Sequence, residues 1–186
     1  MKIIHIITGL RDGGAEHTLF KICKYDLNNT HIIISLTSSG KYFSLLKNLG
    51  IELYCLDANF FSIFKFFYLI KLLRSLKPDI VQTWLAHADF IGGIAARLAG
   101  IKNVFWNIRY SNFEIGKANL TTILIIKILA KLSYLIPELI IIVSKKAKKI
   151  YEIEGFNKKK LKLIPNGYDL SVLKPNKLKL YHKEAK

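Results

Sequence analysis

The chain has 186 residues, 51% of them hydrophobic and 23% charged, which is typical of one globular domain and excludes a disordered polypeptide. Its formal net charge of +16 favours an anionic partner such as lipid headgroups, nucleic acid or a phosphorylated substrate. Solvated surface lysines would account for the same charge equally well. The first apolar run, residues 3–7, is too short for a signal peptide. Cys23 and Cys55 lack metal-ligand spacing, so we expect reduced core thiols and no metal site.

In chain order, short apolar runs alternate with longer helical patterns, which predicts βαβ units. The expected strands are 2–7, 32–36, 52–56, 80–83, 103–108, 139–143 and 162–164. The expected helices are 15–25, 42–49, 62–76, 89–99, 120–135 and 145–155. The predicted fold class is therefore α/β, a Rossmann-like parallel sheet of about seven strands with helices on both faces. Gly50 and Gly100 are expected to end two of the helices.

A glycine pair, Gly13 and Gly14, follows the first expected strand and precedes the first helix. Such a loop lets backbone N–H groups approach a phosphate, with the positive end of the helix behind them. The spacing is not that of a dinucleotide-binding loop, and the second strand ends near Ser35 and Thr37 without an acidic residue. Taken alone, the pattern favours no more than a tight turn.

His87 follows the fourth expected strand, two residues before Asp89. The carboxyl end of a parallel strand is where α/β proteins bind ligands, and a histidine there could donate to a hydroxyl group. The alternative is an ordinary loop histidine beside an aspartate that caps the next helix. Arg109 ends the fifth strand, where its guanidinium could clamp a phosphate or form a salt bridge to Asp89.

Four motifs occur in an order that resembles the N-terminal half of a retaining glycosyltransferase of family 4. They are Gly-Gly-Ala-Glu at 13–16, Trp-x-x-His-Ala-Asp at 84–89, Val-Ser at 143–144 and Pro-Asn-Gly-x-Asp at 165–169. The resemblance implies one half of a GT-B fold, in which two Rossmann-like domains face each other. Residues 1–169 would form the acceptor-side domain, and residues 170–186 a basic tail or remnant of the interdomain linker.

The resemblance also implies roles for individual residues. His87 would face the reacting sugar as the catalytic residue. The expected substrate-binding residues are Gly13, Gly14, Glu16, Asp89 and Arg109. The expected interdomain hinge consists of Asn166, Gly167 and Asp169. It implies no metal and no cofactor, with a UDP- or GDP-sugar as the donor substrate.

In the family, a second domain holds the nucleotide sugar through a Glu-x7-Glu pair, and no such pair follows position 169. We therefore expect a chain that is inactive alone because its donor-binding domain is missing. It would be a truncated product, an excised domain or one half of a two-chain enzyme, with the donor-binding domain as its partner.

The expected acceptor is a lipid-linked glycan or a polysaccharide in cell-surface glycan synthesis. Residues 60–76 form an aromatic helix interrupted by lysines, which suits either an interfacial helix on an anionic membrane or a helix buried on two sides. The first alternative predicts a peripheral protein on the inner face of the cytoplasmic membrane. A different class of function is a non-catalytic basic module that binds membrane or nucleic acid, although no nucleic-acid motif supports the latter.

Overall fold

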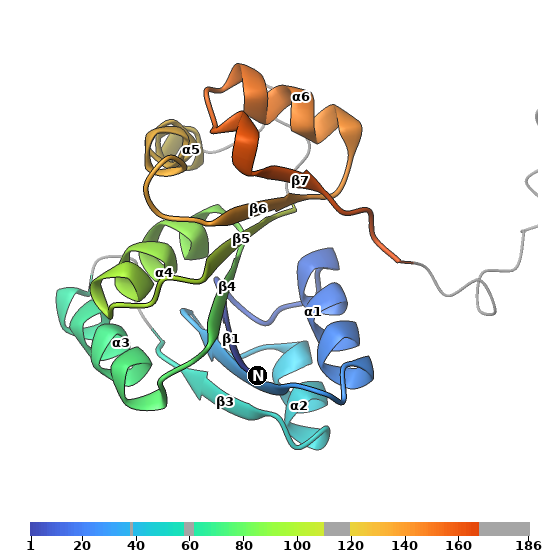
Figure 1. Cartoon of the computed structure of the whole chain (residues 1–186). Helices are drawn as coiled ribbons and strands as arrows, with labels where there is room; N and C mark the ends of the chain where they lie inside the picture. Colours follow the sequence, from blue (N-terminus) through green and yellow to red (C-terminus); the bar gives the residue numbers. More distant parts are fainter. Residues whose placement is uncertain (38, 58–61, 110–119, 168–186) are drawn as a thin grey trace, which may run out of the picture.

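A seven-stranded, entirely parallel sheet organises the computed structural model, which describes residues 1–37, 39–57, 62–109 and 120–167 (Figure 1). The strands are β1 (Lys2–Ile7), β2 (Thr30–Ser35), β3 (Glu52–Cys55), β4 (Ile80–Trp84), β5 (Val104–Ile108), β6 (Leu139–Ile142) and β7 (Leu161–Leu163). Their order in the sheet is β3-β2-β1-β4-β5-β6-β7. This confirms the predicted fold class.

Within the residues that the structure describes, six α-helices connect the strands. They are α1 (Gly14–Tyr25), α2 (Lys41–Asn48), α3 (Ile63–Leu76), α4 (Ala86–Leu98), α5 (Leu120–Leu132) and α6 (Lys145–Ile153). Gly50 and Gly100 have positive φ values of 75° and 90° directly after α2 and α4, as expected for glycines that end helices. No described helix is long and apolar enough to cross a membrane.

Two hydrophobic cores lie on opposite faces of the sheet. The larger core joins the sheet to α3, α4, α5 and α6 through residues such as Leu69, Ala95, Ile126 and Tyr151. The smaller core joins it to α1 and α2 through residues such as Leu19 and Leu46. Helices therefore cover both faces of the sheet. On the face that carries α1 and α2, Figure 1 shows these two helices beside β1–β3 and no described helix beside β6 and β7.

The strand order reverses between β1 and β4, which pair directly with Ile7 opposite Trp84. In open α/β sheets, ligands bind outside the carboxyl ends of the strands at such a switch point. The glycine pair follows β1, His87 follows β4, and Arg109 follows β5, the neighbour of β4. The topology thus brings three distant sequence motifs to one edge of the sheet.

Candidate functional site at the carboxyl edge of the sheet

The connection from β4 to α4 is a single residue, Leu85, in an unusual backbone conformation. Its φ of 73° and ψ of 153° fall in a region occupied almost only by glycine, so the chain stores strain at this turn. The strained turn starts α4 at Ala86, three residues earlier than expected. The alternative of an ordinary loop histidine beside an aspartate that caps the helix is therefore wrong, because His87 lies in the first turn of α4 and Leu85 occupies the N-cap position.

Asp89 is buried beneath this turn, with only 1% of its surface exposed. The Thr83 hydroxyl donates to its Oδ1 at 2.5 Å, while Oδ2 has no hydrogen-bond partner among the described residues. Burial raises the pKa of Asp89 to about 7, partly offset by the bond from Thr83. Burial also lowers the pKa of His87, which favours the neutral form of its imidazole.

Arg109 holds together three parts of the carboxyl edge. Its Nε donates to Asn107 Oδ1 at 2.7 Å, its Nη1 donates to Asn166 Oδ1, and its Cζ lies 5.1 Å from the centre of the Trp84 ring. The salt bridge to Asp89, one of the two alternatives for Arg109, is absent from the contacts of the described residues. Burial lowers the pKa of Arg109 to about 10, which leaves the guanidinium charged at neutral pH.

The glycine loop is built around Gly13 and Glu16. A Cβ atom at Gly13 would lie 2.4 Å from Glu16 Oε2, so a larger residue at position 13 would have to displace the end of the Glu16 side chain. Gly13 is the N-cap of α1 and Glu16 is buried in its first turn. At Gly14, by contrast, an added Cβ would meet nothing within 4 Å. The open side of the loop therefore presents Gly14 and the positive end of α1.

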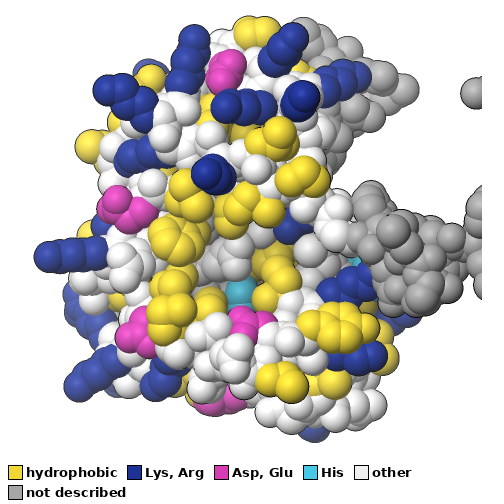
Figure 2. Space-filling model, turned by 45° about the vertical axis from the view of Figure 1, so that its right-hand side comes forward, with side chains coloured by type: hydrophobic (Ala, Val, Ile, Leu, Met, Phe, Trp, Pro, Cys, Tyr) yellow, Lys and Arg dark blue, Asp and Glu magenta, His cyan; other side chains and the backbone are white. Residues whose placement is uncertain are grey.

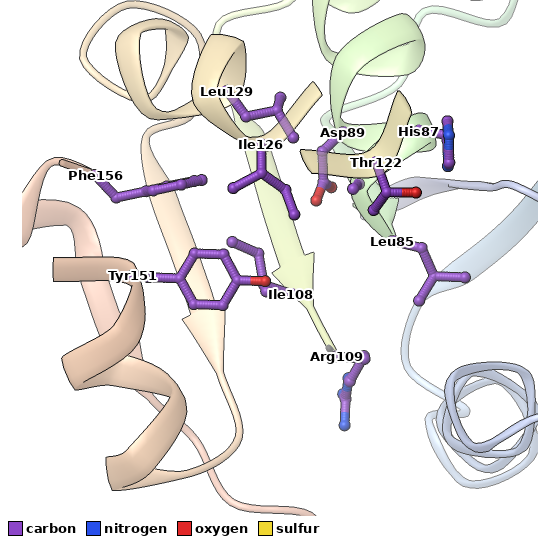
Figure 3. Close-up of a pocket in the computed structure, with 11 residues that line it drawn as sticks. Leu85, His87, Asp89, Ile108, Arg109, Thr122, Ile126, Leu129, Tyr151 and Phe156 are labelled. Atoms are coloured by element: carbon purple, nitrogen blue, oxygen red, sulfur yellow. The ribbon is translucent and has the colours of Figure 1, made fainter. Parts of the chain in front are cut away.

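Two adjoining hollows share Leu85 and Arg109 at this edge. A hollow of about 260 Å³ is bordered by Gly14, Glu16, Arg109, Asn166 and neighbouring residues, which places the glycine loop and the arginine around one space. A second cavity of about 220 Å³ lies beneath α4, α5 and α6 and includes His87 and Asp89 in its lining. In Figure 3, the Asp89 carboxyl group points into this cavity, whereas His87 lies at its edge and turns outward.

Comparison with known proteins gives the family. The family model described as Glycosyltransferase Family 4 matches residues 9–172. The chain belongs to glycosyltransferase family 4. No curated protein sequence matches the chain.

The chain spans about half the length of solved structures that share its fold. Anabaena HepE in complex with UDP and glucose has a TM-score of 0.77 and 18% identity, over 99% of this chain and 50% of its own. The lipopolysaccharide outer core galactosyltransferase WaaB has a TM-score of 0.66 and 14% identity, over 95% and 50% of the two chains. Acinetobacter baumannii MurG has a TM-score of 0.60 and 20% identity, over 94% and 47%. These similarities confirm one half of a GT-B fold.

The structure places most of the residues proposed for this family 4 domain at one edge. Asn166 joins Arg109 there, while Gly167 borders a groove along α1 that also includes His17 and Lys21. Asp169, and with it the expected domain boundary, lies outside the described residues. The substrate-binding, catalytic and hinge roles themselves stay predictions.

Sequence reasoning missed Trp84, Thr83 and Asn107, which position Arg109 and Asp89. Trp84 and Asn107 lie opposite each other in the pairing of β4 with β5. Both are buried near the ends of their strands, Trp84 as an aromatic and Asn107 as a polar side chain. That placement was a signal in the sequence, because an asparagine at the end of an apolar strand needs a hydrogen-bond partner.

A second polar cluster lies on the other face of the sheet. His5 Nε2 faces His31 Nδ1 at 3.0 Å, and Trp84 Nε1 donates to His5 Nδ1 at 3.2 Å. Cys23 lies nearby, so that one ligand atom of each of the two histidines and the cysteine lie within 4.8 Å of one another. A metal on His5 Nε2 would put the ring proton on Nδ1, against the Trp84 N–H donor. Burial also raises the pKa of the Cys23 thiol to about 12. The cluster fits a buried hydrogen-bonded pair better than a metal site.

Proposed function

We propose that this domain is the acceptor-side half of a retaining glycosyltransferase, which transfers a sugar from a nucleotide sugar to a glycan acceptor. The observation that carries the proposal is the meeting of Gly14, Arg109 and the positive end of α1 around one hollow, beside the cavity that includes His87. A helix N-terminus and a charged guanidinium suit a phosphate group, and a neutral imidazole suits a sugar hydroxyl. HepE, which shares this fold, binds UDP and glucose.

In the proposed reaction, this domain contributes position and charge. Arg109 and the α1 N-terminus would stabilise negative charge that develops on the leaving phosphate, since preorganised donors in a dry site favour the transition state. His87, neutral and at the cavity edge, would hold a hydroxyl of the reacting sugar. Asn166 would act at the hinge, keeping Arg109 in place through the hydrogen bond to its Oδ1.

The donor, a UDP- or GDP-sugar, is proposed to need a second domain. The 186 residues cover only half of HepE, WaaB and MurG, all similar in fold. We propose that the domain described here is inactive and binds nucleotide sugars weakly until it faces a donor-binding domain, in the same polypeptide or in another.

The proposed acceptor is a lipid-linked glycan or polysaccharide of the cell surface, reached at the inner face of the cytoplasmic membrane. Phe64 and Phe67 on α3 are 83% and 61% exposed, beside Lys65 and Lys71. Large exposed aromatic side chains next to lysines are typical of surfaces that enter an anionic membrane interface. Figure 2 shows many Lys and Arg side chains around hydrophobic ones on one face of the molecule.

A non-catalytic basic module is the second candidate, favoured by the net charge of +16. Salt titrations against anionic vesicles and against an oligonucleotide separate it from the enzyme. Oligonucleotide binding that is tighter than vesicle binding would favour the module and contradict the proposed membrane partner.

The enzyme proposal is tested by joining residues 1–167 to the half of HepE that this chain does not cover. The chimera should transfer sugar from UDP-glucose to a lipid-linked acceptor, whereas the 186-residue chain alone should not. The chain alone should bind UDP- and GDP-sugars with a dissociation constant no lower than about 1 mM, which corresponds to a binding free energy of roughly −4 kcal/mol. Micromolar binding or transfer by the chain alone would contradict the need for a donor domain.

A further inference from the structure

The 220 Å³ cavity beneath α4, α5 and α6 differs in character from the hollow beside it. Its walls are formed by apolar side chains, chiefly Ile108, Ile126, Leu129 and Phe156, together with the ring of Tyr151. These side chains come from β5, α5, α6 and the segment after α6, and they belong to or border the larger core. A ligand group that enters this cavity must therefore be mostly apolar.

Polar side chains, among them Thr122 and Arg109, also line this mainly apolar cavity, but one buried polar atom of its lining is left without a hydrogen bond. Asp89 Oδ2 points into the cavity and has no hydrogen-bond partner among the described residues, while Oδ1 is held by Thr83. A buried carboxyl oxygen without a partner costs stability, because it has given up its bonds to water. When Asp89 is ionised, as it is above its pKa of about 7, the ligand that fits would return one hydrogen-bond donor to this oxygen.

Few sugar substituents combine one donor with an apolar group. A ring edge that carries several hydroxyl groups would satisfy Asp89 but leave other hydroxyls against apolar walls, at a cost for each. An acetamido group instead offers a single N–H donor and ends in a methyl group. It also carries a carbonyl oxygen, which must remain at the open mouth near Arg109.

We propose that this cavity receives the acetamido group of an N-acetylated amino sugar, with its N–H donating to Asp89 Oδ2 and its methyl group between Ile126 and Tyr151. The inference rests on the proposed function, since it assigns the bound glycan a chemical class. It makes Asp89 a specificity residue of the site.

The test compares two probes that differ only at C2, methyl N-acetyl-β-glucosaminide and methyl β-glucoside, with binding to the 186-residue chain followed by NMR. The acetamido probe should bind about tenfold more tightly, the lower end of what a small apolar group gains in a fitting pocket. Saturation transfer from the protein should be strongest at its acetyl methyl group. Equal affinity for the two probes would overturn the proposal.

Two variants localise the effect. Asp89→Asn is isosteric and can still accept from Thr83, but turns an N–H donor toward the ligand, so the preference for the acetamido probe should disappear. Ile126→Phe should fill the cavity and have the same effect, whereas Ile128→Phe, a matched change at a more exposed site on α5, should not. Thermal unfolding checks that each variant is folded. A preference that survives both Asp89→Asn and Ile126→Phe would place the acetamido group elsewhere.

A third probe, the methyl glycoside of glucosamine, tests the main alternative, in which Asp89 binds a charged amino group. Binding as tight as that of the acetamido probe would indicate an ammonium group paired with the carboxylate and would overturn the proposal. These measurements record binding only, so they are independent of transfer. A chimera that transfers sugar without an acetamido preference would contradict this inference alone, and an acetamido preference without transfer would contradict the proposed function alone.

Discussion

Thr83 and Asp89 are joined by a hydrogen bond of 2.5 Å across the strained turn that links β4 to α4. The bond occupies one oxygen of a buried carboxyl group and leaves the other facing a cavity. Since β4 ends at the switch point of the sheet, this pair connects the architecture of the fold to the site at its edge.

Asp89 should make the protein less stable as the pH rises. Its pKa is about 7 in the folded state and near its ordinary value of 3.8 when unfolded, so the folded state binds the proton more tightly. The contribution to stability is fully present below pH 3.8 and is lost as the pH rises to about 7. Asp89→Asn should remove this dependence and raise the free energy of unfolding at pH 8 by a few kcal/mol, since each pKa unit corresponds to about 1.4 kcal/mol. Urea unfolding of both proteins at pH 5 and pH 8 measures it, and parallel pH profiles would contradict the assignment.

His5 should act in the opposite direction. Burial, and then the charge of His31, lower its folded-state pKa from 6.5 to about 3. Its stabilising contribution is therefore present above pH 6.5 and is lost as the pH falls toward 3. His5→Gln keeps hydrogen-bonding groups beside Trp84 but does not titrate, so its unfolding free energy should fall less between pH 6.5 and 4 than that of the original chain. An equally steep fall would show that other groups cause the acid sensitivity.

Leu85 provides a test of the strained turn through two substitutions. Glycine relieves the backbone strain, whereas alanine keeps it. Both substitutions remove the half-buried leucine side chain, and they differ from each other only by the methyl group of alanine. Strain of this kind costs about 1–3 kcal/mol. Leu85→Gly should therefore be more stable than Leu85→Ala by about 1 kcal/mol or more, the reverse of their order in regular secondary structure, where glycine loses about 0.5–1 kcal/mol. Thermal unfolding decides, and the usual order would mean that Leu85 is unstrained.

The α3 aromatic side chains test the membrane proposal. Phe64→Asp with Phe67→Asp should weaken binding to anionic vesicles without loss of stability, because both rings are largely exposed. Ile153→Asp is the control, since Ile153 on α6 is also 83% exposed. Binding should also weaken as salt rises, because exposed charges are screened beyond about 8 Å at physiological ionic strength. Unchanged sedimentation with vesicles in the double variant would place the contact on another surface.

The sequence predicted the sheet well because its central strands, such as β1 and β2, are largely buried on both sides. Continuous apolar runs such as that of β1 leave little ambiguity, and the glycines after α2 and α4 mark helix ends through their positive φ. The start of α4 was the clearest miss. No helix-start signal precedes Ala86, since the N-cap position holds a leucine that tertiary packing keeps in a conformation typical of glycine.

The candidate site could be predicted only in part, for a related reason. Position at strand ends was enough to single out His87 and Arg109, because parallel strands end at a common edge. The spacing of residues along the sequence did not predict which of these side chains contact each other. Arg109 bonds with Asn166, 57 residues away, and lies over Trp84 instead of pairing with Asp89. The cavity is lined by residues of β5, α5 and α6, which are brought together by tertiary packing that no local pattern reveals.

His87→Ala in the chimera with the other half of HepE tests the central claim most directly. If His87 holds the reacting sugar in the transition state, kcat and kcat/KM should fall together, by an amount that corresponds to roughly 2–4 kcal/mol. The unfolding temperature should change little, because His87 lies at the edge of the cavity and outside both hydrophobic cores. Unchanged transfer by the variant, or a loss that merely follows unfolding, would contradict a glycosyltransferase site at this edge.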